Sequence, residues 1–118
     1  MSRPLCLLAA VLVLAAAGCG GGGSKGDSAT TLKLGQAIGM RALRFHPDAA
    51  QVKVGQTVTW RNEESVPHNV VAQSGAVFES ETFGKDGTFS WTPRKTGTVK
   101  YECTLHPGMT GTVDVVAK

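Results

Sequence analysis

Three side chains that bind soft metal ions follow one another at even spacing near the end of the sequence. Cys103, His106 and Met109 form the pattern Cys-x-x-His-x-x-Met within seven residues, so a short loop can turn all three toward one point. A thiolate, an imidazole and a weak axial thioether are the ligands of a mononuclear copper site that transfers electrons, and such a site takes a further imidazole. The sequence therefore predicts a copper site whose fourth ligand lies elsewhere in the chain.

The fourth ligand must come from the two other histidines of the sequence. His68 directly follows Pro67 and begins an extended run, so its orientation is constrained on both sides by a scaffold element. His46 lies in a turn between two extended segments, where we expect it to be exposed to solvent. Met40 lies in a predicted loop and has no neighbour that would bind a metal with it. His68 is thus the expected fourth ligand.

The N-terminal residues have the features of an export signal. Arg3 supplies a positive charge, and residues 5–17 form an apolar run that is too short to span a bilayer. The run ends in Ala16-Ala17-Gly18-Cys19, which resembles the bacterial lipoprotein signal, in which the cysteine is lipidated and becomes the first residue. Ordinary cleavage nearby, with Cys19 left as a free thiol, is the alternative.

These features predict three parts of the chain. Residues 1–18 are the expected signal peptide, residues 19–30 the lipidated Cys19 with a flexible glycine-rich linker, and residues 31–118 one copper-binding domain. The protein is then exported and anchored to the membrane as a lipoprotein, in the periplasm or at the cell surface. Because Cys6 is removed and Cys19 acylated, Cys103 has no disulfide partner in the domain. It is either a small buried apolar residue or a metal ligand, and its neighbours favour the ligand.

Composition and periodicity predict a small all-β domain. Glycine is abundant, and valine and threonine dominate the second half of the chain. The net charge is +3 with basic residues scattered among acidic ones, which excludes a nucleic-acid-binding surface. Short extended segments separated by turns indicate a sandwich or a barrel. The predicted segments are residues 32–34, 42–45, 51–54, 57–62, 68–72, 88–91, 98–103 and 110–116, while residues 73–85 are left open between a strand and an irregular excursion.

Alternation within these segments predicts which side chains point inward. The expected inward-facing pairs and triplet are Val58 with Trp60, Phe89 with Trp91, Val99 with Tyr101 and Cys103, and Val113 with Val115.

Taken together, residues 40–118 resemble the cupredoxins, the plastocyanin/azurin-like blue copper proteins. The two residues between His106 and Met109 make the ligand loop most similar to that of the amicyanins, although Leu105 stands where those proteins have proline and Gly108 where they have a bulky aromatic residue. The resemblance rests on the segments Phe45-His-Pro, Val52-Lys-Val-Gly-Gln-Thr-Val-Thr-Trp-Arg-Asn62, Val66-Pro-His-Asn-Val70 and Gly97-Thr-Val-Lys-Tyr-Glu-Cys-Thr-Leu-His-Pro-Gly-Met-Thr-Gly111.

The resemblance implies an antiparallel Greek-key β-sandwich that holds one type 1 copper per chain. Asn69 would tie the loop of the first ligand to the cysteine loop through Thr104, and a surface-exposed imidazole would pass the electrons. The implied ligands are three strong ones in a near-trigonal plane and a weak axial thioether: His68, Cys103, His106 and Met109.

The sequence as a whole predicts a membrane-tethered type 1 copper protein that carries one electron at a time. We expect it to be a monomer that exchanges electrons with redox protein partners, and, because no coordination position stays open for a substrate, to have no catalytic residue and no enzymatic activity. An extracytoplasmic protein that binds and passes on copper ions is the alternative, and a metal-free interaction domain is a third possibility.

Overall fold

The computed structural model describes residues 29–118, and within this range the chain forms nine β-strands and no helix. No helix long and apolar enough to cross a lipid bilayer occurs among these residues. The predicted signal peptide, Cys19 and most of the predicted linker lie outside the described residues. The strands are β1 (Thr30–Thr31), β2 (Ile38–Arg41), β3 (Arg44–His46), β4 (Ala49–Lys53), β5 (Val58–Asn62), β6 (Val71–Ser74), β7 (Thr88–Trp91), β8 (Gly97–Glu102) and β9 (Thr110–Val116).

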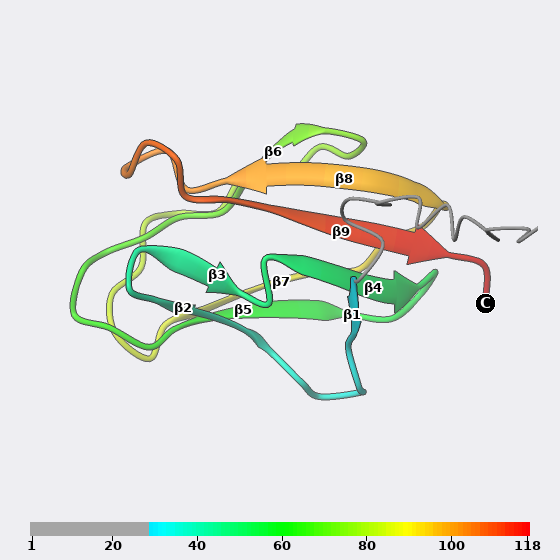
Figure 1. The fold of residues 1–118 in the computed structure, drawn as a ribbon, viewed down its shortest axis with the longest axis horizontal. Helices are drawn as coiled ribbons and strands as arrows, with labels where there is room; N and C mark the ends of the chain where they lie inside the picture. The colour runs from blue at the N-terminus through cyan, green and yellow to red at the C-terminus, as the bar shows by residue number, and fades with distance from the viewer. Residues whose placement is uncertain (1–28) are drawn as a thin grey trace, which may run out of the picture.

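The strands form two sheets that lie face to face (Figure 1). One sheet has the order β1-β4-β9-β8-β6 and the other the order β3-β2-β5-β7, so the predicted β-sandwich is confirmed. The sheets are mixed, however, whereas the resemblance implied antiparallel pairing throughout: β1 with β4, β4 with β9, and β2 with β5 run parallel. The chain changes sheet after most strands, and strands that become neighbours through such crossovers often run in the same direction.

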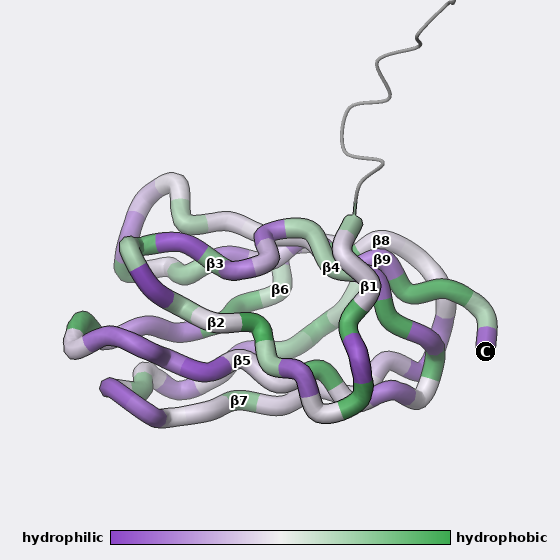
Figure 2. The backbone as a smooth tube through the Cα atoms, turned by 60° about the horizontal axis from the view of Figure 1, so that its bottom comes forward, coloured by the Kyte–Doolittle hydropathy of each residue, from purple (hydrophilic) through white to green (hydrophobic). Residues whose placement is uncertain are grey.

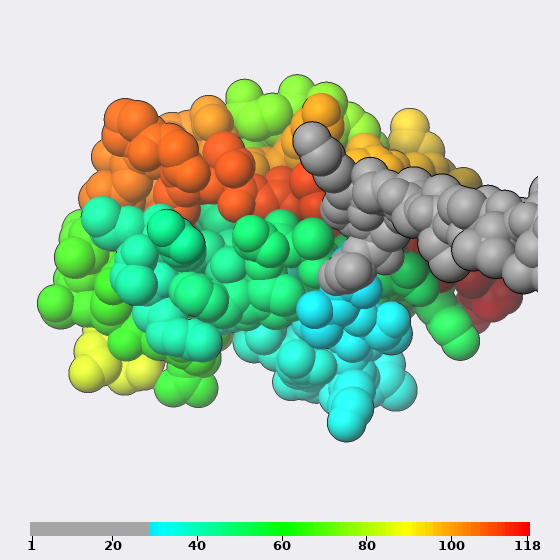
Figure 3. Space-filling view, viewed as in Figure 1, coloured from blue at the N-terminus to red at the C-terminus, as the bar shows by residue number. Residues whose placement is uncertain are grey.

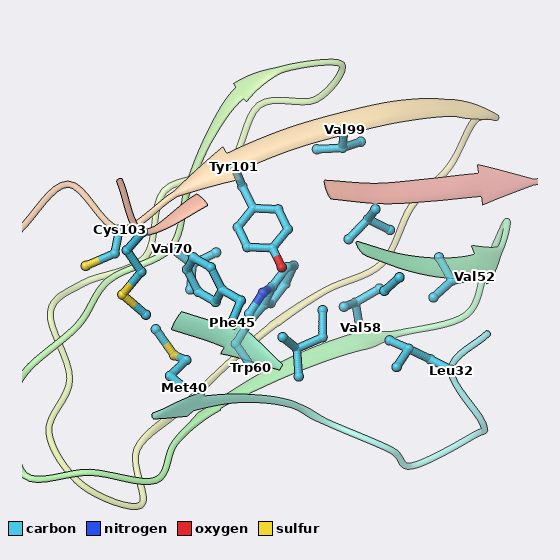
Figure 4. Packing of buried hydrophobic residues seen from close by; sticks show 14 of the residues in the cluster. Leu32, Met40, Phe45, Val52, Val58, Trp60, Val70, Val99, Tyr101 and Cys103 are labelled. Carbon is cyan, nitrogen blue, oxygen red and sulfur yellow. The ribbon is translucent and has the colours of Figure 1, made fainter. Parts of the chain in front are cut away.

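The core lies between the sheets and follows the predicted alternation. Val58 and Trp60 are fully buried, and the relative exposures of Tyr101 and Cys103 are only 1% and 2%. Hydrophobic and hydrophilic residues are interspersed along the strands (Figure 2). Trp60 meets the ring of Tyr101 edge-on at a centroid distance of 5.2 Å, the geometry that aromatic pairs prefer. Cys103 lies at one end of this core and Leu32 at the other (Figure 4).

Three predictions for residues 32–43 are wrong. Met40 lies in β2 and is fully buried rather than in a loop. Ala42 and Leu43 form the turn between β2 and β3, not part of an extended segment. Leu34, predicted in an extended segment, lies in a turn closed by the hydrogen bond from Gln36 N to Lys33 O, which leaves its side chain 88% exposed.

The stretch that sequence left open, residues 73–85, folds back along β6 and the residues before it. Ala72 N donates to Phe78 O at 2.9 Å, and Ser80 N donates to Val70 O at 2.9 Å, so this stretch runs antiparallel to the residues that follow His68. Phe78 then packs its ring on Trp91 at a centroid distance of 4.9 Å. This return segment holds in place the part of the chain that carries His68.

Candidate metal centre

The segment from Cys103 to Met109 is a tight loop between β8 and β9 that two backbone hydrogen bonds close. Cys103 N donates to Met109 O at 2.9 Å, and Met109 N donates to His106 O at 3.1 Å. Pro107 and Gly108 occupy the centre of the second turn, and Gly108 has a φ of +86°. Proline followed by a residue with positive φ is typical of a type II turn. The sequence therefore dictates how closely Cys103, His106 and Met109 approach one another.

His68 enters the site from the segment between β5 and β6 and is held by its backbone. Its N–H donates to Phe83 O at 3.1 Å and its carbonyl accepts from Phe83 N at 2.9 Å. The side chain is completely buried. Because both backbone groups are bonded, the imidazole has little freedom to move relative to the sheets.

Asn62, which the sequence did not single out as a site residue, organises the loop that leads to His68. It is completely buried, and its amide nitrogen donates to Val66 O at 2.8 Å and to Phe83 O at 3.1 Å. Its amide oxygen accepts from Glu64 N at 2.9 Å. The signal was visible in the alternation, since Asn62 is a polar residue at an inward-facing position after Val58 and Trp60.

The structure brings three of the predicted ligands together at the end of the sandwich. The candidate donor atoms of His68, Cys103 and His106 all lie within 4.8 Å of one another. The Cys103 sulfur is 3.7 Å from Nδ1 of His68, and the two imidazole rings have a centroid distance of 4.9 Å. These separations are close to what one ion spans when each donor lies about 2.0–2.3 Å from it.

The hydrogen bonds of both imidazoles leave Nδ1 free to bind a metal. Nε2 of His68 lies 2.6 Å from a carboxylate oxygen of Glu64, and Nε2 of His106 lies 3.1 Å from the carbonyl oxygen of Pro67. Both partners accept a hydrogen bond, so in the neutral form of each ring Nε2 carries the proton and Nδ1 has the lone pair that a metal needs. A buried thiol facing two such nitrogens fits the donor set that copper takes.

Glu64 is the second residue of the site that the sequence missed. Burial raises the pKa of this carboxyl, but hydrogen bonds from His68, Leu43 and Ala42 outweigh burial, and the pKa is lowered from its ordinary value. A carboxylate that accepts from the remote nitrogen of a metal-binding histidine fixes the ring and raises its basicity. A glutamate four residues before the candidate ligand was the available signal, but in a loop that spacing predicts no contact.

Asn69 and Thr104 join the two ligand-bearing segments directly, as the resemblance implied. The Asn69 amide nitrogen donates to Thr104 Oγ1 at 2.7 Å, and Thr104 N donates to the Asn69 amide oxygen at 2.8 Å. This reciprocal pair fixes the position of the loop that carries Cys103 relative to the segment that carries His68.

The remaining histidine lies away from the donor group, and the methionine is buried at the end of the ligand loop. His46 was predicted in a solvent-exposed turn, but it ends β3 and is half-buried. One of its ring nitrogens lies 3.1 Å from the carbonyl oxygen of Arg41, outside the group of three donors. Met109 is 2% exposed at the end of the ligand loop.

Comparison with known proteins agrees with the fold and the donor set. Residues 30–116 match the family of copper binding proteins described as plastocyanin/azurin. The chain is 38% identical over 82 residues to amicyanin of Paracoccus denitrificans, a match that covers 66% of this chain and 63% of that protein. It is 35% identical over 97 residues to plastocyanin of Scenedesmus fuscus, covering 72% of this chain and 97% of the relative.

A solved structure of the copper(I) form of an amicyanin variant superposes with a TM-score of 0.66 at 34% identity, covering 72% of this chain and 85% of the other. The chain spans less than two thirds of the length of the amicyanin it matches. With the family match extending over nearly all the described residues, the sandwich and its cluster of a thiol and two imidazoles have one common explanation. The chain belongs to the plastocyanin/azurin family of copper-binding proteins.

Proposed function

We propose that this domain binds one type 1 copper and carries single electrons between redox proteins. His68, Cys103 and His106 would be the strong ligands and Met109 the weak axial one. The proposal depends on one observation above all: a buried thiol faces two imidazoles whose Nδ1 atoms are left free by hydrogen bonds at Nε2. Copper, when bound, would supply the one-electron chemistry.

The surrounding residues suit a site that changes little during electron transfer. His68 is fixed by Phe83 and Glu64, and the loop carrying Cys103 is fixed by Asn69 and by its own closing hydrogen bonds. A metal held this rigidly rearranges little when its charge changes, which favours electron transfer over release of the ion. All four proposed ligand positions are taken by side chains, so we propose no enzymatic activity.

His106 is the proposed path for electrons between the copper and a partner. It is half-buried, whereas His68 is completely buried, and its neighbour Leu105 is 45% exposed. A partner that contacts this end of the molecule would therefore approach the copper most closely through the imidazole of His106.

Export and membrane attachment through a lipid on Cys19 belong to the same proposal. The amicyanins, plastocyanin and halocyanin that the chain resembles are relatives by sequence. Mass spectrometry of the membrane fraction from cells expressing the full chain would find an acylated N-terminal Cys19, and a Cys19→Ser variant would be lost from that fraction. An unmodified thiol at Cys19 in the wild type would contradict this part.

Voltammetry of the copper-loaded protein distinguishes an electron carrier from a protein that passes on copper. An electron carrier gives a reversible one-electron couple while the copper stays bound over many cycles. Loss of copper to an added copper-free acceptor within the same time, without a reversible couple, would favour copper transfer instead.

A further inference from the structure

The turn between β2 and β3 has a backbone conformation that its residues do not favour. Arg41 pairs with Arg44, so Ala42 and Leu43 are the two central residues of the hairpin, and their φ angles are +52° and +55°. Hairpins with positive φ at both positions are usually built with glycine, asparagine or aspartate. For other residues this left-handed region is sterically strained. Such a conformation persists only where its surroundings impose it.

The carboxylate of Glu64 imposes this backbone conformation on the turn. One oxygen accepts from Ala42 N at 2.9 Å, and the other accepts from Leu43 N at 3.2 Å. Two consecutive N–H groups of the turn thus point to one side chain, which lies on the loop after β5. The turn and Glu64 therefore hold each other in place.

The same carboxylate contacts the proposed copper ligand. The Glu64 oxygen that accepts from Leu43 N also lies 2.6 Å from Nε2 of His68. Three donors from two separate segments meet at a side chain that is 21% exposed. The oxygens that accept from the turn and from the imidazole belong to one rigid planar carboxylate. The carboxylate therefore cannot rotate away from the turn without also changing its contact with the imidazole.

Further contacts keep the turn and the Glu64 loop together. Glu63 N donates to Met40 O at 2.9 Å, and the Arg41 guanidinium donates to the Glu63 carboxylate at 2.8 Å. The hairpin also lies beside the ligand loop at the left end of the molecule, where Arg44 and Met109 line one small cleft (Figure 3).

We propose that the Ala42–Leu43 turn is a positioning element for His68 and acts through Glu64. This inference rests on the proposed copper-binding function and adds to it a part of the chain that touches no ligand. The left-handed turn aims two N–H groups at the carboxylate, the carboxylate then has one orientation, and that orientation holds the His68 ring with Nδ1 directed to the Cys103 sulfur. A turn of another shape would release Glu64 and leave the ring free to rotate.

A matched pair of substitutions at Ala42 tests the proposal. Valine disfavours positive φ because it is β-branched, whereas glycine adopts it freely, and both keep the backbone N–H. In the copper-free protein, NMR of the His68 imidazole should show a slowly exchanging Nε2 proton in the wild type and in Ala42→Gly, and a faster one in Ala42→Val. In chelator competition, Ala42→Val should bind copper(I) up to about tenfold more weakly than Ala42→Gly, while Glu64→Ala binds it about 10- to 100-fold more weakly than the wild type.

The Glu64→Ala background shows whether the turn acts through Glu64. There, Ala42→Val and Ala42→Gly should bind copper equally, and a difference that persists would overturn the proposal. Equal proton exchange and equal affinity of the two folded variants in the wild-type background would overturn it too. Leu43→Val and Leu43→Gly form a second pair should urea denaturation show Ala42→Val unfolded. Failure of the wild type to bind copper would count against the proposed function, while the NMR comparison still decides the role of the turn.

Discussion

Replacing Asn69 with alanine removes both side-chain hydrogen bonds between the segment that carries His68 and the loop that carries Cys103. The two bonds, at 2.7 and 2.8 Å, join Asn69 to the hydroxyl and the backbone N–H of Thr104. Each contributes about 0.5–1.5 kcal/mol, so we expect the free energy of unfolding to fall by about 1–3 kcal/mol. For a domain of this size, a loss of 2 kcal/mol lowers Tm by about 8–16 °C.

Urea denaturation of the copper-free protein measures this effect, and Thr104 supplies the matched variants. Thr104→Ser keeps both hydrogen bonds and should have nearly wild-type stability. Thr104→Val keeps the backbone N–H and loses only the hydroxyl, so it should cost about half as much as Asn69→Ala. In the Asn69→Ala background, Thr104→Val should cost almost nothing, because the bond to the hydroxyl is already gone. Additive losses, or an Asn69→Ala variant within about 0.3 kcal/mol of the wild type, would refute the role assigned to this pair.

Three further predictions concern the packing and backbone around the site. Gly111→Ala would place a methyl group against the Tyr101 hydroxyl and should lower the free energy of unfolding, measured by urea denaturation, by about 1–3 kcal/mol. The loss should be smaller in the Tyr101→Phe background, and an equal loss in both backgrounds would contradict the clash. Burial raises the pKa of Tyr101, and the neighbouring Trp60 offsets only part of the rise. Because Tyr101 is the one tyrosine of the chain, phenolate absorbance should be absent from the folded protein at pH values around 10 and should appear on unfolding. The free energy of unfolding should therefore fall as the pH rises above about 10. Phenolate absorbance of the folded protein at that pH would contradict this. Gly108→Ala should cost about 1 kcal/mol because of the positive φ of this residue, and a neutral result would contradict the type II turn.

The sequence predicts the parts of the fold where alternation is long and regular. β8 has six residues and β9 has seven, in which buried positions alternate with more exposed ones, and these inward faces were predicted correctly. β2 has four residues and includes Gly39, and β3 has three, which is too short for a period of two to be recognised. Their hairpin also lacks the glycine or asparagine that normally marks such a turn. It depends on the carboxylate of Glu64, which comes from a distant part of the sequence.

The candidate site also has residues that the sequence predicts and residues that it does not. Cys103 and His106 are close in sequence, so the approach of their donor atoms was predictable from spacing. His68 was found because its residue type was scarce and its flanking residues were constrained. Asn62 and Glu64 could not be assigned roles, because some of their hydrogen-bond partners lie in distant segments that only the packed sandwich brings together: Phe83 for Asn62, and Ala42 and Leu43 for Glu64.

The direct test of the account is the visible absorption of the purified protein after addition of one equivalent of copper(II). The account predicts an intense blue or green thiolate-to-copper band that is lost in Cys103→Ser, while both proteins remain folded by circular dichroism. A folded wild-type protein that binds copper(II) without such a band, or a Cys103→Ser variant that keeps it, would contradict the proposed site.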